Sequence, residues 1–217
     1  MSLKREELVL LAELGSATVY EAAGRAGLLE GPWLRLVPGS RAAGPARTVL
    51  CAPGDNLMVH AAMAVLQPGE VLVLALPTPE PVALLGELLA TQAQARGAAA
   101  ILVEAAVRDA DEIAALGLPV WARWVSPRGA ERKTPGRLGV PVRVGGVAVA
   151  QGDYLVLDGD GVVAVPRERA REVLEKARAR AEREAALRER YRRGELSIDL
   201  YGLRPLVEEE LRRADGA

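Results

Sequence analysis

The sequence predicts an α/β domain followed by a helical C-terminal extension. Two nearly continuous apolar runs, at 71–76 and 98–103, are typical of strands that are buried on both faces of a sheet. Helical segments alternate with these runs, a strand-rich segment follows, and a long charged helix comes last. We therefore expect an α/β domain over residues 1–166. Residues 167–217 should form a long helix and a tail.

The first part of the domain alternates helices with strands. Glycine and proline turns separate the elements, and Gly15-Ser16 divides the first helical segment, with Ser16 as a candidate N-cap. A proline-rich loop at 77–81 leads to the helix that begins near Gly86. In chain order we expect helices at 6–14 and 17–26, a strand at 46–51, a helix at 56–64, a strand at 71–76, a helix at 87–96, a strand at 98–103, a helix at 109–116 and a strand at 120–125.

The second part of the chain is rich in short strands and ends in a helix. Polar residues at 126–138, with glycine and proline among them, predict a long loop. Strands should follow at 141–149, 154–158 and 162–165, and a charged helix at 167–193 should end at Gly194. The thin apolar stripe of this helix fits packing on a partner subunit and packing on its own domain equally well.

Composition limits the classes of function. Acidic and basic residues nearly balance, with a net charge of -1, so nothing indicates a nucleic-acid partner. No apolar run approaches the ~20 residues that span a bilayer, so we expect no membrane contact. Cys51 is the only cysteine, which excludes an intramolecular disulfide. The first residues do not read as a secretory signal, and together these features favour a cytoplasmic protein.

Two short segments carry the candidate chemistry. Gly86-Glu87-Leu88-Leu89 opens a helix, whose first N–H groups have no partner within the helix and can bind a carboxylate or an enolate oxygen. Arg108 and Asp109 follow a strand; the arginine can pair with a substrate carboxylate, and the aspartate can ligate a divalent cation. Because His60 is the only histidine, a metal here would rest mainly on carboxylate and water, which favours Mg²⁺ or Mn²⁺.

Each of these segments also has an ordinary structural interpretation. Asp109 with Glu112 matches a capping box, in which the aspartate side chain caps its own helix. Glu87 is a favourable charge in the first turn of a helix. Arg108 fits a surface residue. From the residues alone, capping is the simpler interpretation of Asp109.

Other polar positions fit structural roles first. Asp55 or Asn56 stands at a strand-to-helix turn and fits a helix cap, with lining of a site as the second interpretation. His60 fits a packed or hydrogen-bonded histidine. Asp158-Gly159-Asp160-Gly161 resembles half a calcium loop but lacks its glutamate, so a β-turn is the better interpretation. No GxGxxG or Walker sequence supports a nucleotide-dependent enzyme.

The motifs taken together resemble the 4-hydroxy-4-methyl-2-oxoglutarate/4-carboxy-4-hydroxy-2-oxoadipate aldolase family, which is related to the RraA-like regulators of ribonuclease E activity. The family signature is an acidic residue, twenty intervening residues and Arg-Asp, which Glu87, Arg108 and Asp109 satisfy. The resemblance extends over about residues 14–205. The other matching segments are 17–25, 43–49, 53–57 with His60, 145–146 and 158–163.

This resemblance implies a layered α/β/α domain with a central mixed sheet and a class II pyruvate aldolase activity. By that similarity, Arg108 and the Leu88 and Leu89 amides beside Gly86 would bind the pyruvyl portion of the substrate. Asp109 would anchor Mg²⁺ or Mn²⁺, and Glu87 would help to hold the water that acts as base. The substrate would be 4-hydroxy-4-methyl-2-oxoglutarate or a similar 4-hydroxy-2-oxo acid, with oxaloacetate decarboxylation as a possible second activity.

The C-terminal segment favours the aldolase branch of the family. Residues 194–203 look like the aldolases' C-terminal extension, and Glu184 lies where those enzymes carry a glutamate that reaches a neighbouring subunit's site. The resemblance thus implies a homo-oligomer, a homotrimer or homohexamer. The alternative is a non-catalytic RraA-like regulator that binds a ribonuclease. A menaquinone methyltransferase is disfavoured, because no glycine-rich cofactor loop follows the first strand.

Three positions depart from the family pattern. Glu104-Ala105 stands where the family has Asp-Gly, Trp124 stands where a glycine is common, and Gln151 replaces the proline of a Pro-Gly-Asp sequence. We expect Trp124 to narrow or reshape the pocket. The catalytic set is intact, so these departures bear on substrate choice.

Overall fold

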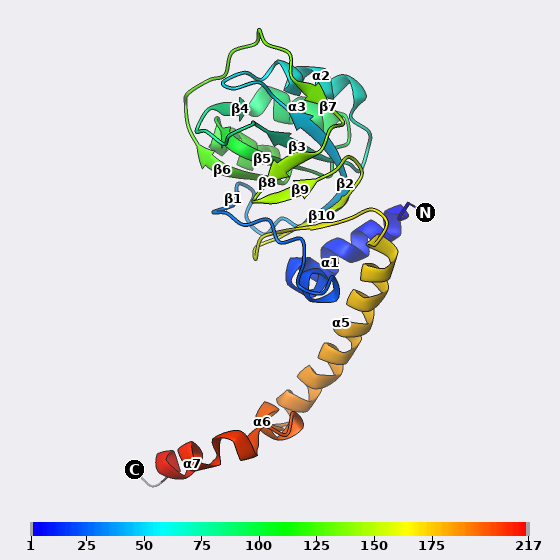
Figure 1. The fold of residues 1–217 in the computed structure, drawn as a ribbon, viewed down its shortest axis with the longest axis vertical. Helices are drawn as coiled ribbons and strands as arrows, with labels where there is room; N and C mark the ends of the chain where they lie inside the picture. Colours follow the sequence, from blue (N-terminus) through cyan, green and yellow to red (C-terminus); the bar gives the residue numbers. More distant parts are fainter. Residues whose placement is uncertain (1, 216–217) are drawn as a thin grey trace. The chain divides into compact units, whose positions relative to one another are not determined.

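The structure is a computed structural model that describes residues 2–215. The chain divides into two compact units, Met1–Ala177 and Arg178–Ala217. The first unit holds every strand of the described chain, and the second holds the end of a long helix and two shorter ones (Figure 1). The division lies within this long helix, later in the chain than the expected boundary at residue 166. The helix begins against the first unit's core, through Ala170, Val173 and Leu174.

A mixed sheet forms the centre of the first unit. Its main path has the order β1-β6-β5-β3-β2-β10-β11, with β4 paired to β5 and β7 paired to β2 (Figure 1). The pairs β2–β3, β3–β5, β4–β5 and β5–β6 are parallel, and the others in this sheet are antiparallel. The strands are β1 (Leu34–Arg35), β2 (Ala42–Leu50), β3 (Val71–Ala75), β4 (Ala83–Leu85), β5 (Ala100–Val107), β6 (Val120–Val125), β7 (Arg137–Leu138), β10 (Tyr154–Leu157) and β11 (Val162–Val165); β8 (Val142–Val144) and β9 (Val147–Val149) form a separate hairpin.

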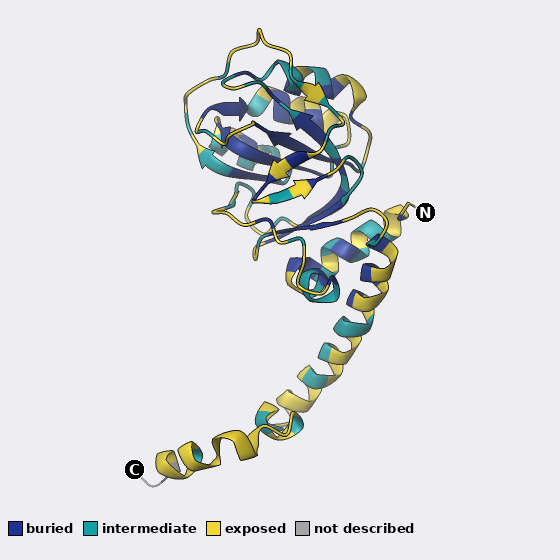
Figure 2. Ribbon diagram, in the orientation of Figure 1, coloured by how far each residue is buried: buried dark blue, intermediate teal, exposed yellow. Residues whose placement is uncertain are grey.

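Helices cover the sheet at both ends, which confirms the layered α/β architecture with a mixed sheet. One cluster joins the parallel strands to α2 (Leu57–Val65), α3 (Glu87–Ala95) and α4 (Ala110–Leu116). Another joins β10 and β11 to α1 (Arg5–Ala22) and the first turns of α5 (Ala170–Arg192). The third cluster lies on the other face of the parallel strands, where the β8–β9 hairpin covers it. Figure 2 shows that the strands are the most deeply buried part of the chain.

Most of the expected elements are present, and the differences have local causes. β2 begins at Ala42, before the expected start, because the Gly44-Pro45 pair that reads as a turn is paired to β10. β5 runs on to Val107 through the buried Glu104, whose charge interrupts the apolar run. The short β1, β4 and β7 carry too few residues for a periodic signal, so the sequence does not predict them, and β7 lies at the end of the segment expected as a loop.

The break in α1 confirms the expected division, although Ser16 does not cap the second half. Gly15 has φ 81° and ψ 162°, which is not helical. The Ser16 N–H donates to Asp158 Oδ2 at 2.8 Å, and its hydroxyl donates to Oδ1 at 2.6 Å. Asp158, from the β10–β11 turn, therefore satisfies the helix start in place of a local cap. A Cβ at Gly15 would lie 2.9 Å from Asp158 Oδ2, so this approach favours glycine.

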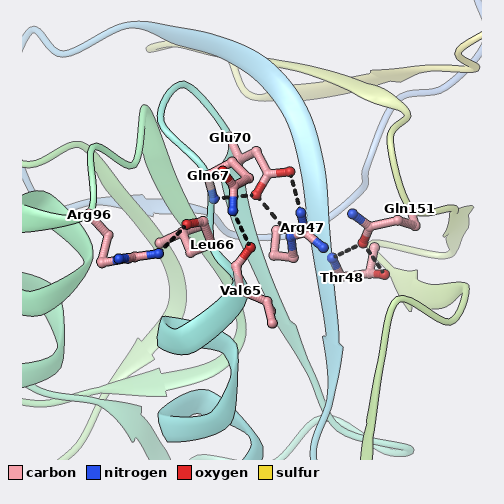
Figure 3. Close-up of polar contacts among 8 residues, drawn as sticks. All are labelled: Arg47, Thr48, Val65, Leu66, Gln67, Glu70, Arg96 and Gln151. Carbon is pink, nitrogen blue, oxygen red and sulfur yellow. Dashed lines mark hydrogen bonds and ion pairs between the residues drawn. The ribbon is translucent and has the colours of Figure 1, made fainter.

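An ion pair and an amide fasten β2 to its neighbours at the end of the sheet where β3 begins. Arg47 donates two hydrogen bonds to Glu70, of 2.8 and 2.7 Å, and Glu70 also accepts the Gln67 N–H (Figure 3). Gln151 Oε1 accepts the Thr48 N–H at 2.9 Å and lies 3.2 Å from its hydroxyl (Figure 3). The amide of Gln151 thus serves a β2 backbone donor, which a proline side chain cannot do.

The second unit is helical and largely exposed. It contains the last part of α5, α6 (Ser197–Leu200) and α7 (Arg204–Asp215). Ion pairs three to five residues apart hold its surface, among them Arg190 with Glu195 and Arg204 with Asp199. No helix in the described chain is long and apolar enough to cross a membrane.

The Arg47–Glu70 pair generates a stability prediction. Glu70→Ala should lower the free energy of unfolding by roughly 2 kcal/mol, between the values typical of surface and buried pairs, because it leaves a mostly buried guanidinium without its partner. Urea unfolding measures the change. The matched control is Glu168→Ala, at an exposed position, which should shift the midpoint little. Equal effects at both positions would contradict the prediction.

Candidate active site

The candidate site forms where two neighbouring parallel strands end. β4 leads into α3 and β5 leads into α4, and Leu85 is paired in register with Val107. The Arg108 N–H donates to the Leu85 carbonyl at 3.0 Å, which extends the pairing by one residue. Ligand sites of open α/β sheets lie beyond the carboxyl ends of parallel strands. The fold therefore brings together the two segments that the sequence analysis singled out.

Asp109 turns its carboxylate away from its own helix. Its backbone has φ 55° and ψ 46°, the left-handed conformation that non-glycine residues rarely adopt. Its carbonyl accepts the Ile113 N–H, but its side chain makes no cap hydrogen bond, so the capping-box interpretation with Glu112 is wrong. Instead, Asp109 Oδ2 accepts the Glu87 N–H at 3.1 Å. The carboxylate therefore lies at the start of α3.

Gly86 makes this contact between the two turns possible. A Cβ at this position would lie 2.6 Å from Asp109 Oδ2 and 3.1 Å from Arg108 Nε. Gly86 is also the N-cap residue of α3, so its small size exposes the helix start. The Leu88 and Leu89 N–H groups follow in the first turn, where no intrahelical acceptor reaches them. They are free to bind an anion.

The Arg108 guanidinium lies beside the carboxylate without being fully engaged by it. Its Nε lies 3.5 Å from Asp109 Oδ2, and the Arg108 side chain is 51% exposed. Gly129, from the loop after β6, faces its Nη1 atom, at 3.3 Å from the position that a Cβ would take. An exposed pair at this distance contributes little to stability. Arg108 can therefore bind an incoming carboxylate through its outer nitrogens.

A cavity of about 150 Å³ opens at this point. It contains Gly86, Leu88, Leu89, Arg108 and Asp109, all predicted from the sequence. The Glu87 side chain is not part of its wall; its Oε1 accepts a hydrogen bond of 2.7 Å from the Thr91 hydroxyl on the same helix. The remaining lining residues are Asn56, His60, Ala83, Gly129, Ala130 and Arg132.

Sequence reasoning missed Arg132 and interpreted His60 differently. His60 is exposed and lines the cavity, where a packed or hydrogen-bonded histidine was expected. Asn56 also lines it; its Nδ2 donates to the Leu84 carbonyl, and its Oδ1 is buried without a partner among the described residues. Arg132 lies in the long polar loop, whose path no periodic pattern reveals. The one available signal was its position among the basic residues of that loop.

Asp55 fastens this loop to the site. Its Oδ1 accepts the N–H of Leu57, the first residue of α2, at 2.7 Å, and its Oδ2 accepts the Lys133 and Thr134 N–H groups at 2.7 and 2.9 Å. Asn56 is the N-cap residue of α2 and its side chain makes no cap hydrogen bond, so the expected cap is replaced by this bond to Asp55, one residue earlier. Burial raises the pKa of this carboxyl, but the backbone hydrogen bonds from Leu57, Lys133 and Thr134 outweigh it, so the net pKa is lowered.

The donor set fits a weakly held divalent cation rather than a closed metal site. Among residues 2–215, no cluster of three histidine, cysteine, aspartate or glutamate side chains could enclose a metal. Asp109 is the one carboxylate that lines the cavity, and its side chain is 39% exposed. Mg²⁺ keeps several waters and is commonly held by one or two carboxylates together with its substrate. The residues present therefore fit such an ion.

Comparison with known proteins places the chain in a family. Residues 16–164 match the RraA-like family, described as Aldolase/RraA. This chain is a member of the RraA-like family. The match covers the domain that carries the cavity.

Individual relatives agree with this family assignment. A Halalkalibacterium halodurans protein, provisionally named a 4-hydroxy-4-methyl-2-oxoglutarate aldolase, is 36% identical over 62% of this chain and 64% of its own length. A Xanthomonas campestris protein with the same provisional name is 38% identical over 55% of this chain and 72% of its own. The chain is also similar to the crystal structure of Streptomyces coelicolor RraAS2, an unusual member of the RNase ES inhibitor RraA protein family. The two share 31% sequence identity and superpose with a TM-score of 0.73, over 87% of this chain and 98% of that one.

Two of the departures from the RraA-like pattern lie outside the cavity wall. Trp124 is half-buried and opposite Ala106 on the neighbouring strand, and it is not a lining residue, so the expected narrowing of the pocket is not seen. Glu104 pairs with Arg123 at 2.8 Å and accepts the Gly145 N–H at 3.2 Å. Arg123 in turn lies over the Trp33 ring, 5.2 Å from its centroid. Glu104 thus belongs to a structural cluster with Arg123 and Trp33.

Glu184 belongs to the second unit and not to the described site of the first. It forms an ion pair of 2.8 Å with Arg180, one turn earlier on α5. This pair is a common arrangement on an exposed helix. Its contribution to a neighbouring subunit's site stays a prediction of the RraA-like resemblance.

The strained backbone of Asp109 yields a prediction about stability. Asp109→Gly should be more stable than Asp109→Ala by about 1 kcal/mol, because both variants lose the carboxylate but only glycine adopts a left-handed conformation without cost. Chemical unfolding of the two proteins measures the difference. At Asp111, inside α4, the same pair of substitutions should rank in the opposite order. An alanine variant at residue 109 that equals the glycine variant would contradict the strain.

The lowered pKa of Asp55 yields a prediction about pH. A carboxyl whose folded pKa lies below its unfolded value stabilises the fold above the ordinary pKa of 3.8, and this contribution is lost as the pH falls through the folded value. Asp55→Asn should therefore be less stable than the wild type at pH 7, by about 1–3 kcal/mol for a lost acceptor. The gap should narrow below pH 3.8. A gap that stays constant across this range in urea titrations would contradict the assignment.

Proposed function

We propose that this chain is a divalent-metal-dependent class II pyruvate aldolase. Its substrate would be 4-hydroxy-4-methyl-2-oxoglutarate or a similar 4-hydroxy-2-oxo acid, cleaved to pyruvate, and it would also decarboxylate oxaloacetate. The names of the Halalkalibacterium and Xanthomonas relatives support the reaction class. The observation that carries the proposal is the meeting of Asp109, Arg108 and the open start of α3 at one cavity.

The start of α3 and Arg108 bind the pyruvyl carboxylate. The free Leu88 and Leu89 N–H groups and the positive end of the helix dipole favour an anion at this position. Arg108 adds a charged donor from the opposite turn, and the two together fix the orientation of the 2-oxo acid. Because Arg108 is held only loosely by Asp109, binding the substrate breaks no strong internal pair.

Asp109 would bind the metal ion, and Glu87 would hold the water that takes the proton. Mg²⁺ or Mn²⁺, held by Asp109 and water, would supply a Lewis acid that polarises the 2-oxo group. The Glu87 carboxylate, which accepts a hydrogen bond from the Thr91 hydroxyl and lies outside the cavity wall, would turn from Thr91 toward the cavity to hold the water that removes the 4-hydroxyl proton. As the C4 oxygen becomes a carbonyl, the C3–C4 bond would break, and its electron pair would form the pyruvate enolate, whose negative charge Arg108 stabilises. Return of the proton from the water to C3 would then give pyruvate. Decarboxylation of oxaloacetate would leave the same enolate.

The proposal includes a homo-oligomer, a trimer or a hexamer. The second unit carries exposed apolar side chains, and Glu184 lies on its long helix. In the assembly, this unit would pack on a neighbouring subunit, and Glu184 would reach the neighbour's site. The exposed apolar residues that support this are Leu196, Tyr201, Leu203, Leu206 and Val207.

The second candidate is a ribonuclease regulator. It is favoured by the 31% identity to RraAS2 of the RNase ES inhibitor family over 98% of that chain. A regulator needs a surface for its partner and does not need Arg108, Asp109 and Glu87 together. Binding to a ribonuclease that survives Arg108→Ala, in a protein without turnover, would favour the regulator.

Turnover and its metal dependence test the aldolase. Pyruvate release from 4-hydroxy-4-methyl-2-oxoglutarate and from oxaloacetate should require Mg²⁺ or Mn²⁺ and should stop with EDTA. Asp109→Ala should lower kcat/KM by about 100-fold or more, because it removes the one carboxylate in the cavity wall. Asp111→Asn, at an exposed position on α4, is the matched control. Metal-independent turnover, or full activity of Asp109→Ala, would contradict the proposal.

A further inference from the structure

Arg132 is a cation at the cavity wall that the reaction described above leaves without a role. It lines the same cavity as Arg108, so the wall carries two arginines and one carboxylate, that of Asp109. Among the described residues, no hydrogen bond or ion pair engages the Arg132 side chain. The neighbouring Glu131 is paired with Lys133 at 2.8 Å, so it does not neutralise Arg132. The cavity thus offers two separate cations.

The backbone on both sides of Arg132 is fixed to the start of α2. The Glu131 N–H donates to the Gly54 carbonyl at 2.8 Å, and the Asn56 N–H donates to the Glu131 carbonyl at 2.9 Å. The two residues after Arg132, Lys133 and Thr134, donate their N–H groups to Asp55. An arginine on a free loop would lose much conformational entropy on binding, whereas a fixed backbone reduces that cost. Arg132 is therefore placed in advance.

We propose that Arg132 binds the second carboxylate of a dicarboxylic 2-oxo acid and so determines the substrate class. This inference rests on the proposed function, because it takes the pyruvyl carboxylate to lie at Arg108 and the start of α3. The far carboxylate of a five-carbon acid would then pair with Arg132, the other cation of the cavity wall. Planar, bidentate pairing with a carboxylate is the interaction for which a guanidinium is suited. Monocarboxylic 4-hydroxy-2-oxo acids would bind without this contact.

His60 and Asp55 support Arg132 in different ways. Asp55 is a positioning residue, because it fixes the backbone after Arg132 and makes no part of the cavity wall. His60 lines the cavity from α2 and is the one imidazole of the chain. It would add a hydrogen-bond donor beside the second carboxylate. The preference for dicarboxylic over monocarboxylic acids would depend on Arg132, because a monocarboxylic acid has no second carboxylate to pair with its charge.

Binding of two unreactive acids separates this inference from the aldolase proposal. Calorimetric titration, in the presence of Mg²⁺, uses 2-oxoglutarate, which has two carboxylates and no hydroxyl to cleave, and pyruvate, which has one. The wild type should bind 2-oxoglutarate more tightly. Arg132→Gln should weaken 2-oxoglutarate about 10- to 100-fold, as expected for a charge-assisted hydrogen bond, and leave pyruvate within about twofold. Arg132→Lys keeps the charge but loses the planar, bidentate guanidinium, so its affinity for 2-oxoglutarate should lie between those of the wild type and Arg132→Gln.

The matched control is Arg137→Gln, an exposed arginine at the end of the same loop that does not line the cavity. It should leave both affinities unchanged, and thermal melts of each variant confirm that it is folded. Equal weakening of both acids by Arg132→Gln would indicate general attraction of anions and overturn the inference. Equal wild-type affinity for the two acids would also overturn it. If no 2-oxo acid is turned over, the aldolase proposal fails, while these affinities still decide the role of Arg132.

Discussion

The hydrogen bond from the Glu87 N–H to Asp109 Oδ2 is the interaction on which the candidate site depends. It joins the turn after β4 to the turn after β5, and it exists only because the two strands are parallel neighbours that end together. It also requires that Gly86 have no Cβ and that Asp109 take a left-handed backbone. Backbone strain of this kind persists only where the surrounding structure holds it, and it gathers at functional positions.

The electrostatics of the cavity follow from this arrangement. The bond to Glu87 uses one carboxylate oxygen of Asp109 and one orphan N–H of α3, and it leaves the next two N–H groups for a ligand. Arg108 approaches the same oxygen only to 3.5 Å, with both side chains substantially exposed. The charges of Arg108 and Asp109 therefore neutralise each other only in part, and both remain available to a ligand. The cavity can thus accept an anion at the helix start and a cation at the carboxylate, which are the two partners that a metal-assisted 2-oxo acid reaction brings together.

The sequence predicts the regular parts of this fold well and the site only in part. β3 and β6 are apolar enough that their bounds are close to those expected, and α3 begins at Glu87 as Gly86 indicates. The motif alone pairs Glu87 with Arg108 and Asp109. Two facts were out of reach, however. The sign of φ at Asp109 decides between capping and ligation, and the residue before a helix carries no sequence signal for it. The path of the loop after β6, which brings Arg132 to the cavity, is set by contacts with residues far away in the sequence.

Asp55 links the stability of the fold to the shape of the cavity. One of its oxygens accepts the first N–H of α2, whose His60 forms part of the cavity wall. The other accepts an N–H of the loop that carries Arg132. Helix and loop therefore cannot move independently without leaving buried N–H groups unsatisfied, which is costly. The far end of the sheet is held separately, by Arg47 with Glu70 and by Gln151 with Thr48. With the backbone fixed at both ends, changes of substrate in such a domain are more accessible through single side chains at the cavity wall than through movement of its loops. On the role proposed for Arg132, substitution of residue 132 would change the acid that binds and would leave Arg108, Asp109 and the open start of α3 in place.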